Sequence, residues 1–176
     1  MVIRPSQKDD VPAMSRVYVQ TWQETYLGVV PYGYLYAMSA PELELGFLNQ
    51  QQSRQVVGYV AEDAGRVIGF ISGGYERHGD NIYNGEIYAL YVLKKHQRQG
   101  AGTKLVSALA AQLNHFGIYS MLTWVLENNP YRRFYEKLNG MYLRNNRVPF
   151  AGEVIDVAAY GWLDTSLIHE GSKRIR

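Results

Sequence analysis

The sequence predicts a single α/β (α+β) domain, with a mixed, mainly antiparallel sheet of six to seven strands and helices on both faces. Two observations lead to this class. Segments with strand character outnumber those with helical periodicity, and the central strands are followed directly by helices. A chain of 176 residues also fits one domain and can bury a sizeable core.

The first half of the chain predicts a short strand, two helices separated by a loop, and a hairpin. Ser6 or Asp9 can cap the first helix. In chain order the elements are a strand at 2–4 ended by Pro5, a helix with Val11, Met14, Val17, Tyr18 and Trp22 along one face, a loop with one helical turn at 27–41, a helix at 41–48, and strands at 56–61 and 66–75 joined by a turn at 62–65.

The second half predicts a strand and a helix, a second strand and helix, and a final strand pair. These are a strand at 86–92, a helix at roughly 101–116 with Gly117 as its C-cap, a strand at 120–126, a helix from Pro130 to Leu138 closed by Asn139-Gly140, and strands at 141–150 and 154–162 around Ala151-Gly152. Residues 1–165 thus form the expected domain, and 166–176 form a polar, basic C-terminal tail.

Composition excludes several classes of protein. The chain is 47% hydrophobic and 19% charged, as in ordinary globular proteins, and its net charge of +2 gives no reason to expect a nucleic acid or a membrane surface as partner. The absence of cysteine excludes a disulfide framework and thiolate metal sites and agrees with a cytoplasmic location. No apolar run reaches the roughly 20 residues of a membrane span, and no signal-peptide pattern is present.

The stretch from Glu86 to Val106 predicts an anion site. An apolar strand leads into a turn with two glycines, Gly100 and Gly102, and a helix follows at once. Such a turn presents backbone N–H groups at the positive end of a helix dipole, and phosphate is the expected anion. The pattern is neither the Walker form, because Thr103-Lys104 follow Gly102, nor the dinucleotide form, because the third glycine position holds leucine.

What remains is Gln97-x-x-Gly100-x-Gly102 after a strand, which resembles the acetyl-CoA pyrophosphate loop of the GNAT family of N-acetyltransferases. A second match is the segment 124–140, in which Asn128 and Tyr135 occupy the family's asparagine and tyrosine places. Glu86, eleven residues before Gln97, stands where several members carry a catalytic glutamate. The resemblance covers nearly the whole chain. Two positions depart from the family pattern: Asn139 stands where glycine is frequent, and Tyr131 stands where alanine is frequent.

The resemblance implies that acetyl-CoA is the co-substrate, with no metal. A splay in the sheet would free strand backbone for the pantetheine arm, and backbone N–H groups of the turn would hold the pyrophosphate, assisted by Arg98 or Lys104. The cofactor-binding residues expected on this basis are Leu90, Tyr91, Val92, Gln97, Arg98, Gln99, Gly100, Ala101, Gly102, Thr103 and Asn128. The alternative for the two glycines is a tight turn without a ligand, and for Asn128 an N-cap of the helix that follows.

The same resemblance implies two catalytic residues. Glu86 would accept the proton of the attacking amine, since an amine with a lysine-like pKa is protonated at pH 7. Tyr135 would protonate the departing thiolate, which a phenol with a pKa near 10 can do without ionising early. The alternatives are a surface or ion-paired carboxylate for Glu86 and helix-to-sheet packing for Tyr135. The resemblance implies direct attack by the amine in a ternary complex, and an acyl-cysteine route is excluded because the chain has no cysteine.

Other functions receive less support. The histidines at 78, 96, 115 and 169 lack metal-ligand spacing, and no hydrolase elbow is present. A non-catalytic acyl-CoA sensor on the same fold is the alternative function, and homodimer formation has no signature. The acceptor, a small cationic amine or a protein N-terminus or lysine, is suggested only by Glu24 among the aromatic residues Trp22, Tyr26, Tyr32, Tyr34 and Tyr36.

Overall fold

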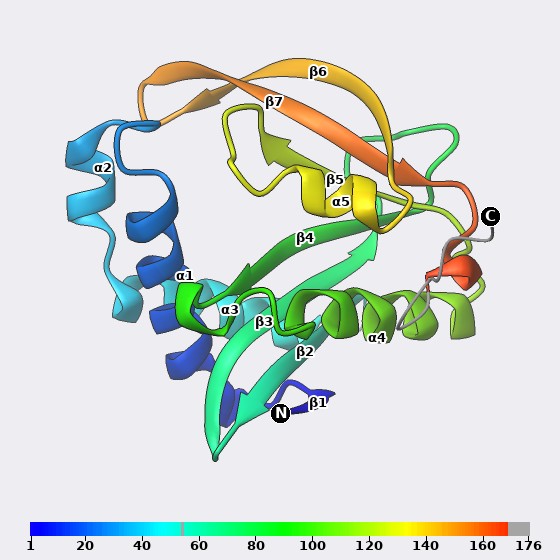
Figure 1. The fold of residues 1–176 in the computed structure, drawn as a ribbon, viewed down its shortest axis with the longest axis horizontal. Helices are drawn as coiled ribbons and strands as arrows, with labels where there is room; N and C mark the ends of the chain where they lie inside the picture. The colour runs from blue at the N-terminus through cyan, green and yellow to red at the C-terminus, as the bar shows by residue number, and fades with distance from the viewer. Residues whose placement is uncertain (54, 169–176) are drawn as a thin grey trace.

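The computed structural model describes residues 1–53 and 55–168, and within these ranges seven strands form one sheet (Figure 1). The strand order is β1-β2-β3-β4-β5-β7-β6, and every neighbouring pair is antiparallel except β4 and β5, which run parallel. The strands are β1 (Val2–Pro5), β2 (Val56–Asp63), β3 (Arg66–Tyr75), β4 (Gly85–Val92), β5 (Met121–Leu126), β6 (Met141–Phe150) and β7 (Glu153–Trp162). The predicted mixed, mainly antiparallel sheet is confirmed.

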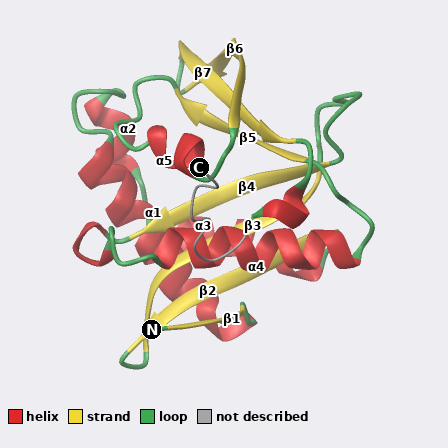
Figure 2. Ribbon diagram, turned by 45° about the vertical axis from the view of Figure 1, so that its right-hand side comes forward, coloured by secondary structure: helices red, strands yellow, loops and turns green. Residues whose placement is uncertain are grey.

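Helices cover both faces of this sheet, as Figure 2 shows. The α-helices are α1 (Val11–Thr25), α2 (Tyr32–Ala37), α3 (Ala40–Gln52), α4 (Ala101–His115) and α5 (Arg133–Lys137), with short 3-10 turns at Lys8–Asp10, Lys94–His96 and Thr165–Leu167. Successive strand residues point to opposite faces. Ile71 therefore packs against Leu109 on the α4 side, while Phe70 packs with Met14 on the side of α1 and α3.

The two parallel strands separate partway along their length. β4 and β5 are paired only from Gly85 to Ile87, opposite Met121 to Thr123. On its other side β4 remains paired with β3 as far as Val92, with a bulge beside Ser72 and Gly73. The edge of β4 beyond Ile87 is therefore left open toward β5, and this opening is the splay that the family resemblance implied.

The turn into α4 has the conformation that glycine favours. Gly100 precedes the helix with φ of 86°, in the left-handed region where residues with a Cβ are strained. Gly102 matters for packing instead, because a Cβ there would lie 3.1 Å from the ring of Phe134 on α5. One glycine thus sets the backbone of the turn, and the other lets α5 approach α4.

Several boundaries differ from those expected. The 3-10 turn Lys8–Asp10 precedes α1, so Asp10 rather than Ser6 or Asp9 stands at the N-cap position. The hairpin turn is the two-residue Ala64-Gly65, because β2 continues to Asp63. α5 begins at Arg133 rather than Pro130, because the backbone from 130 to 132 forms a turn first. Asn139, with φ of 62°, closes that helix as expected.

The ordered chain continues past residue 165. Thr165 to Leu167 form a 3-10 turn, and Ile168 is buried in the core cluster against α4. The rest of the expected tail, from 169 to 176, lies outside the described residues. Within the described ranges no helix is long and apolar enough to cross a membrane.

Candidate active site

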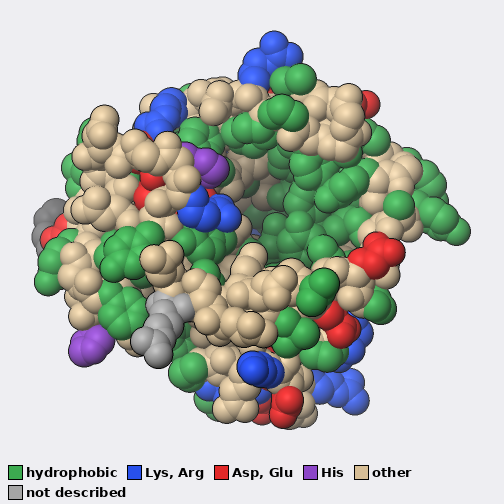
Figure 3. All heavy atoms as spheres, turned by 180° about the vertical axis from the view of Figure 1, so that it is seen from behind, with side chains coloured by type: hydrophobic (Ala, Val, Ile, Leu, Met, Phe, Trp, Pro, Cys, Tyr) green, Lys and Arg blue, Asp and Glu red, His purple; other side chains and the backbone are tan. Residues whose placement is uncertain are grey.

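A cavity of about 580 Å³ occupies the opening between β4 and β5. Seen from behind, the surface is hollowed and the walls are largely hydrophobic side chains (Figure 3). The lining includes Phe134 and Tyr135, which pack against the α4 core, and Trp22 and Tyr26, which belong to the cluster on the α1 side. The cavity therefore connects the α4 side of the sheet with the α1 side.

The α4 end of the cavity has the features of an anion site. The first N–H groups of a helix lack partners within the helix, and no described side chain caps α4. Gly100, Gly102 and Thr103 line the cavity at this point. The side-chain amide of Gln97 donates to the carbonyl oxygen of Val92 at 3.0 Å, which ties the turn to the end of β4.

Three cationic side chains line the same end of the cavity. Arg98 lies in the turn before α4, and Arg133 and Lys137 lie one helical turn apart on α5. Together with the N-terminus of α4 they attract anions. No other lining residue in the described ranges is a lysine, an arginine, an aspartate or a glutamate.

Most of the predicted cofactor residues meet at this site. Those that line the cavity are Leu90, Tyr91, Val92, Gln97, Arg98, Gly100, Gly102 and Thr103. Ala101 does not line it, because its side chain is buried in the core beneath α4. Gln99 also lies outside the lining, and its side chain donates to the Lys95 carbonyl oxygen at 3.2 Å.

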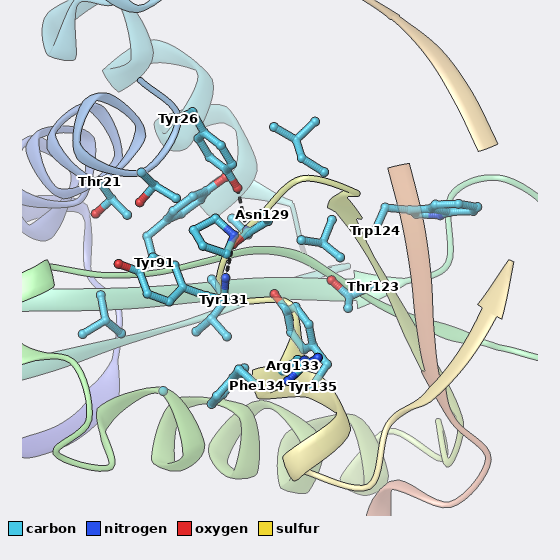
Figure 4. Close-up of a pocket in the computed structure, with 18 of the residues that line it drawn as sticks. Thr21, Tyr26, Tyr91, Thr123, Trp124, Asn129, Tyr131, Arg133, Phe134 and Tyr135 are labelled. Atoms are coloured by element: carbon cyan, nitrogen blue, oxygen red, sulfur yellow. Dashed lines mark hydrogen bonds between the residues drawn. The ribbon is translucent and has the colours of Figure 1, made fainter. Parts of the chain in front are cut away.

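Tyr135 faces the cavity from α5 beside Thr123 of β5 (Figure 4). Its ring stacks on that of Tyr160, with centroids 5.7 Å apart. Burial raises the pKa of the Tyr135 phenol to about 12, and the neighbouring hydroxyl of Thr123 offsets part of this rise. The phenol is therefore a weaker acid than the expected value near 10 suggested, and it keeps its proton throughout the neutral range.

Glu86 does not face the cavity, contrary to the sequence-based expectation. The residue is 1% exposed, and its carboxylate accepts hydrogen bonds from Arg77: from Nη2 at 2.5 Å, from Nε at 3.0 Å and from the backbone N–H at 3.2 Å. Both carboxylate oxygens are thus engaged by one guanidinium. This arrangement matches the ion-paired alternative considered for Glu86.

The asparagine at the end of β5 is displaced by one residue from the expected one. Asn128 is exposed and absent from the lining, whereas Asn129 lines the cavity. Figure 4 shows Asn129 pointing toward Tyr26, to whose hydroxyl its amide donates at 2.7 Å. The Asn129 side-chain oxygen accepts from the backbone N–H of Tyr131 at 2.7 Å, so Asn129 rather than Asn128 makes the turn that leads to α5.

Only part of the expected aromatic acceptor lid reaches the cavity. Trp22 and Tyr26 line it, and Trp22 Nε1 donates to the hydroxyl of Tyr91 at 3.0 Å. The three tyrosines of the α2 region do not line it, and Tyr32 and Tyr36 are 68% and 78% exposed. Glu24 is exposed and also lies outside the lining. The acidic part of the expected lid is therefore absent from this cavity.

Sequence reasoning did not identify Thr123, Asn129, Arg133 or Lys137. The two cations could have been found, because residues 133 and 137 are four apart and share one face of a helix that already carries Tyr135. Thr123 gave no comparable signal. It matters because its hydroxyl lies beside Tyr135, which is twelve residues away in the sequence and reaches it only through the fold.

Comparisons with known proteins identify the family of this chain. The model of the acetyltransferase (GNAT) family matches residues 16–141. The chain is 34% identical over 170 residues to the uncharacterized N-acetyltransferase YuaI of Bacillus subtilis, covering 96% of each protein. The chain belongs to the GNAT family of acetyltransferases, and the family resemblance seen in the sequence is confirmed.

Solved structures show the same fold at lower identity. A ribosomal-protein-alanine N-acetyltransferase from Brucella melitensis matches with a TM-score of 0.73 and 18% identity, over 92% of this chain and 99% of that one. YncA from Salmonella typhimurium, solved with its cofactor acetyl-CoA, matches with a TM-score of 0.71 and 22% identity, over 100% and 99%. These likenesses establish that the single α/β domain is a GNAT fold.

Proposed function

We propose that this chain transfers the acetyl group of acetyl-CoA to a primary amine while both substrates are bound. The observation that carries the proposal is one continuous cavity, which joins the uncapped N-terminus of α4 to the hydroxyl of Tyr135 and continues to the α1 side of the sheet. The structure of YncA with acetyl-CoA supports this choice of donor. The family membership supports the reaction class.

The residues at the α4 end fit a coenzyme A diphosphate. N–H groups in the first turn of α4 would bind the pyrophosphate oxygens, because they have no partner in the helix and lie at its positive end. Arg98, Arg133 and Lys137 would neutralise the phosphate charge. The left-handed Gly100 supports the fit, since it lets the backbone turn into the helix with its N–H groups exposed.

The open edge of β4 would hold the rest of the donor. Backbone groups from Leu90 to Val92 have no strand partner on the β5 side, so they can bind the pantetheine amides. The bound donor supplies an acetyl thioester. A backbone N–H near Tyr91 or Val92 would polarise the thioester carbonyl, and one such donor lowers a barrier by about 2.7–4 kcal/mol.

Tyr135 would serve as the general acid. Because burial raises the pKa of its phenol to about 12, the group is protonated when the reaction begins. Stacking on Tyr160 fixes the ring, and the hydroxyl lies beside Thr123 in the cavity. From this position the O–H can give its proton to the departing sulfur.

We assign no proton-transfer step to Glu86. Its burial and its bonds to Arg77 support a structural role at the start of β4. The role of general base stays a prediction that a variant can test. The cytoplasmic location and the homodimer also stay predictions.

The test is release of coenzyme A thiol from acetyl-CoA in the presence of a panel of primary amines. A thiol reagent reports this release without background, because the protein has no cysteine. We expect thiol release that depends on the amine, and a product heavier than the amine by one acetyl group. Binding of acetyl-CoA without transfer to any amine of the panel would contradict the proposal and favour the acyl-CoA sensor.

A further inference from the structure

The α1 side of the cavity, where the acceptor would enter, has no ionisable carboxyl group among its described lining. The cationic lining residues all lie on the turn before α4 and on α5, at the donor end. On the α1 side the described lining consists of aromatic, aliphatic, threonine and asparagine side chains, among them Trp22, Thr25 and Phe150. This half of the cavity is therefore neutral.

Carboxylates outside the lining either have other partners or face solvent. Glu86 is bound by Arg77, and Asp80 accepts from Arg144 at 2.7 Å. Glu24 is exposed and outside the lining. An ammonium group entering the α1 side would lose its water without gaining a counter-charge, and burying an unpaired charge is strongly unfavourable.

The rings on this side are packed against one another. The indole of Trp22 lies nearly parallel to Tyr18 and to Phe150, in each case with centroids 5.6 Å apart. The rings of Tyr34 and Phe150 pack edge to face, with centroids 4.6 Å apart. With two parallel ring neighbours and 7% exposure, Trp22 has little free face for a cation. The wall suits a flat, uncharged substituent that packs edge to face against these rings.

The chemistry of the site points the same way. An amine attacks only in its neutral form, and no carboxylate among the described lining residues can remove a proton from an ammonium group. An aromatic amine is neutral at pH 7, because its nitrogen lone pair is delocalised into the ring. It therefore needs no base before attack, and its ring matches the packed aromatic wall.

We propose, on the basis of the proposed function, that the acceptor is a primary aromatic amine. The amine nitrogen forms a bond to the acetyl carbon as the carbon–sulfur bond breaks. Tyr135 gives its proton to the sulfur, and the proton lost by the nitrogen restores the phenol. The products are an N-aryl acetamide and coenzyme A thiol, so atoms and charges balance.

Four acceptors test this proposal at saturating acetyl-CoA: 4-methoxyaniline, 4-methoxybenzylamine, spermidine and a lysine-containing peptide. We expect kcat/KM for 4-methoxyaniline to exceed that for each of the others at least tenfold at pH 7. The benzylamine carries the same ring on a more basic nitrogen, so its disadvantage shrinks as the pH rises to 9. Preference for spermidine or the peptide overturns the aromatic acceptor but leaves the proposed function standing. Acetyl-CoA binding without any turnover overturns both.

A charge introduced on the α1 side gives an independent test. Thr25 ends α1, lines the cavity and is only partly buried, so a longer side chain can be accommodated there. We expect Thr25→Glu to raise the ratio of spermidine to 4-methoxyaniline kcat/KM at least tenfold, whereas the uncharged control Thr25→Gln changes it less than twofold. An unchanged ratio in Thr25→Glu overturns the inference that the missing carboxylate sets the preference.

Binding of the product provides a measurement without turnover. In the presence of coenzyme A, calorimetry should show that 4-methoxyacetanilide binds at least tenfold more tightly to the wild type than N-acetylspermidine does. The opposite order contradicts an aromatic acceptor site whatever the rate of the chemical step.

Discussion

Replacing Glu86 by glutamine separates a structural role of this carboxylate from a catalytic one. Glu86 is 1% exposed and accepts from Arg77 through both oxygens, at 2.5 and 3.0 Å. Glutamine keeps one oxygen but presents an NH₂ group to the second guanidinium donor. A net hydrogen bond to a charged group contributes about 1.5–3 kcal/mol. Because Arg77 is half exposed and can return to water, we expect a loss of about 2 kcal/mol in the free energy of unfolding.

The assay is urea and thermal denaturation together with steady-state kinetics on the same preparation. For a chain of this length, 2 kcal/mol corresponds to a fall in Tm of about 4–8 °C. We expect this fall while kcat/KM stays within threefold of the wild type at 25 °C. Glu24→Gln, at an exposed position outside the cavity, is the control and should change neither quantity. If kcat/KM instead drops at least 100-fold while the stability is unchanged, the reasoning is refuted and Glu86 is the base.

Two further substitutions test the N-terminal packing and the turn before α4. Hydrogen bonds from Arg4 lower the pKa of the Asp10 carboxyl in the folded protein. The ion pair therefore stabilises the fold fully at a pH above the pKa that Asp10 has in the unfolded chain. This stabilisation is lost as the pH falls through the lower pKa of the folded state. Asp10→Asn should therefore cost about 1.5–3 kcal/mol at pH 7 in urea denaturation, and the difference should narrow below about pH 4; a constant difference down to pH 2 would contradict the ion pair. Gly100→Ala meets no atom within 4 Å but strains a backbone with φ of 86°. We expect it to cost about 1–2 kcal/mol and to weaken acetyl-CoA binding severalfold by calorimetry, and unchanged binding would argue against the anion site.

The strand, turn and helix that form the proposed donor site could be predicted because they depend on local sequence. A strand, a glycine turn and a helix follow each other from 86 to 106, and this order alone places N–H groups at the end of β4. Tyr135 was proposed from the family resemblance of the segment 124–140, in which a strand, a turn and a short helix follow each other. Both features are set by residues close together in the chain.

The differences from the expected positions arose from contacts made only through the fold and from one local turn that the sequence pattern did not indicate. The burial of Glu86 depends on Arg77, which reaches it from the segment after β3. The shift from Asn128 to Asn129 follows from a turn at 130–132 that delays the start of α5 until Arg133. The neutrality of the α1 side depends on which side chains of several separate elements face one cavity. No periodicity in the sequence reports such a convergence.

The central claim is that Tyr135 delivers a proton inside a cavity that binds the donor independently of it. Tyr135→Phe keeps the ring that stacks on Tyr160 and removes only the hydroxyl. The decisive measurement is kcat with the best amine of the panel, beside the Kd for acetyl-CoA from calorimetry. We predict that kcat falls by about 10²- to 10⁴-fold while Kd changes less than twofold. A kcat within threefold of the wild type would contradict the assignment of Tyr135 as the acid.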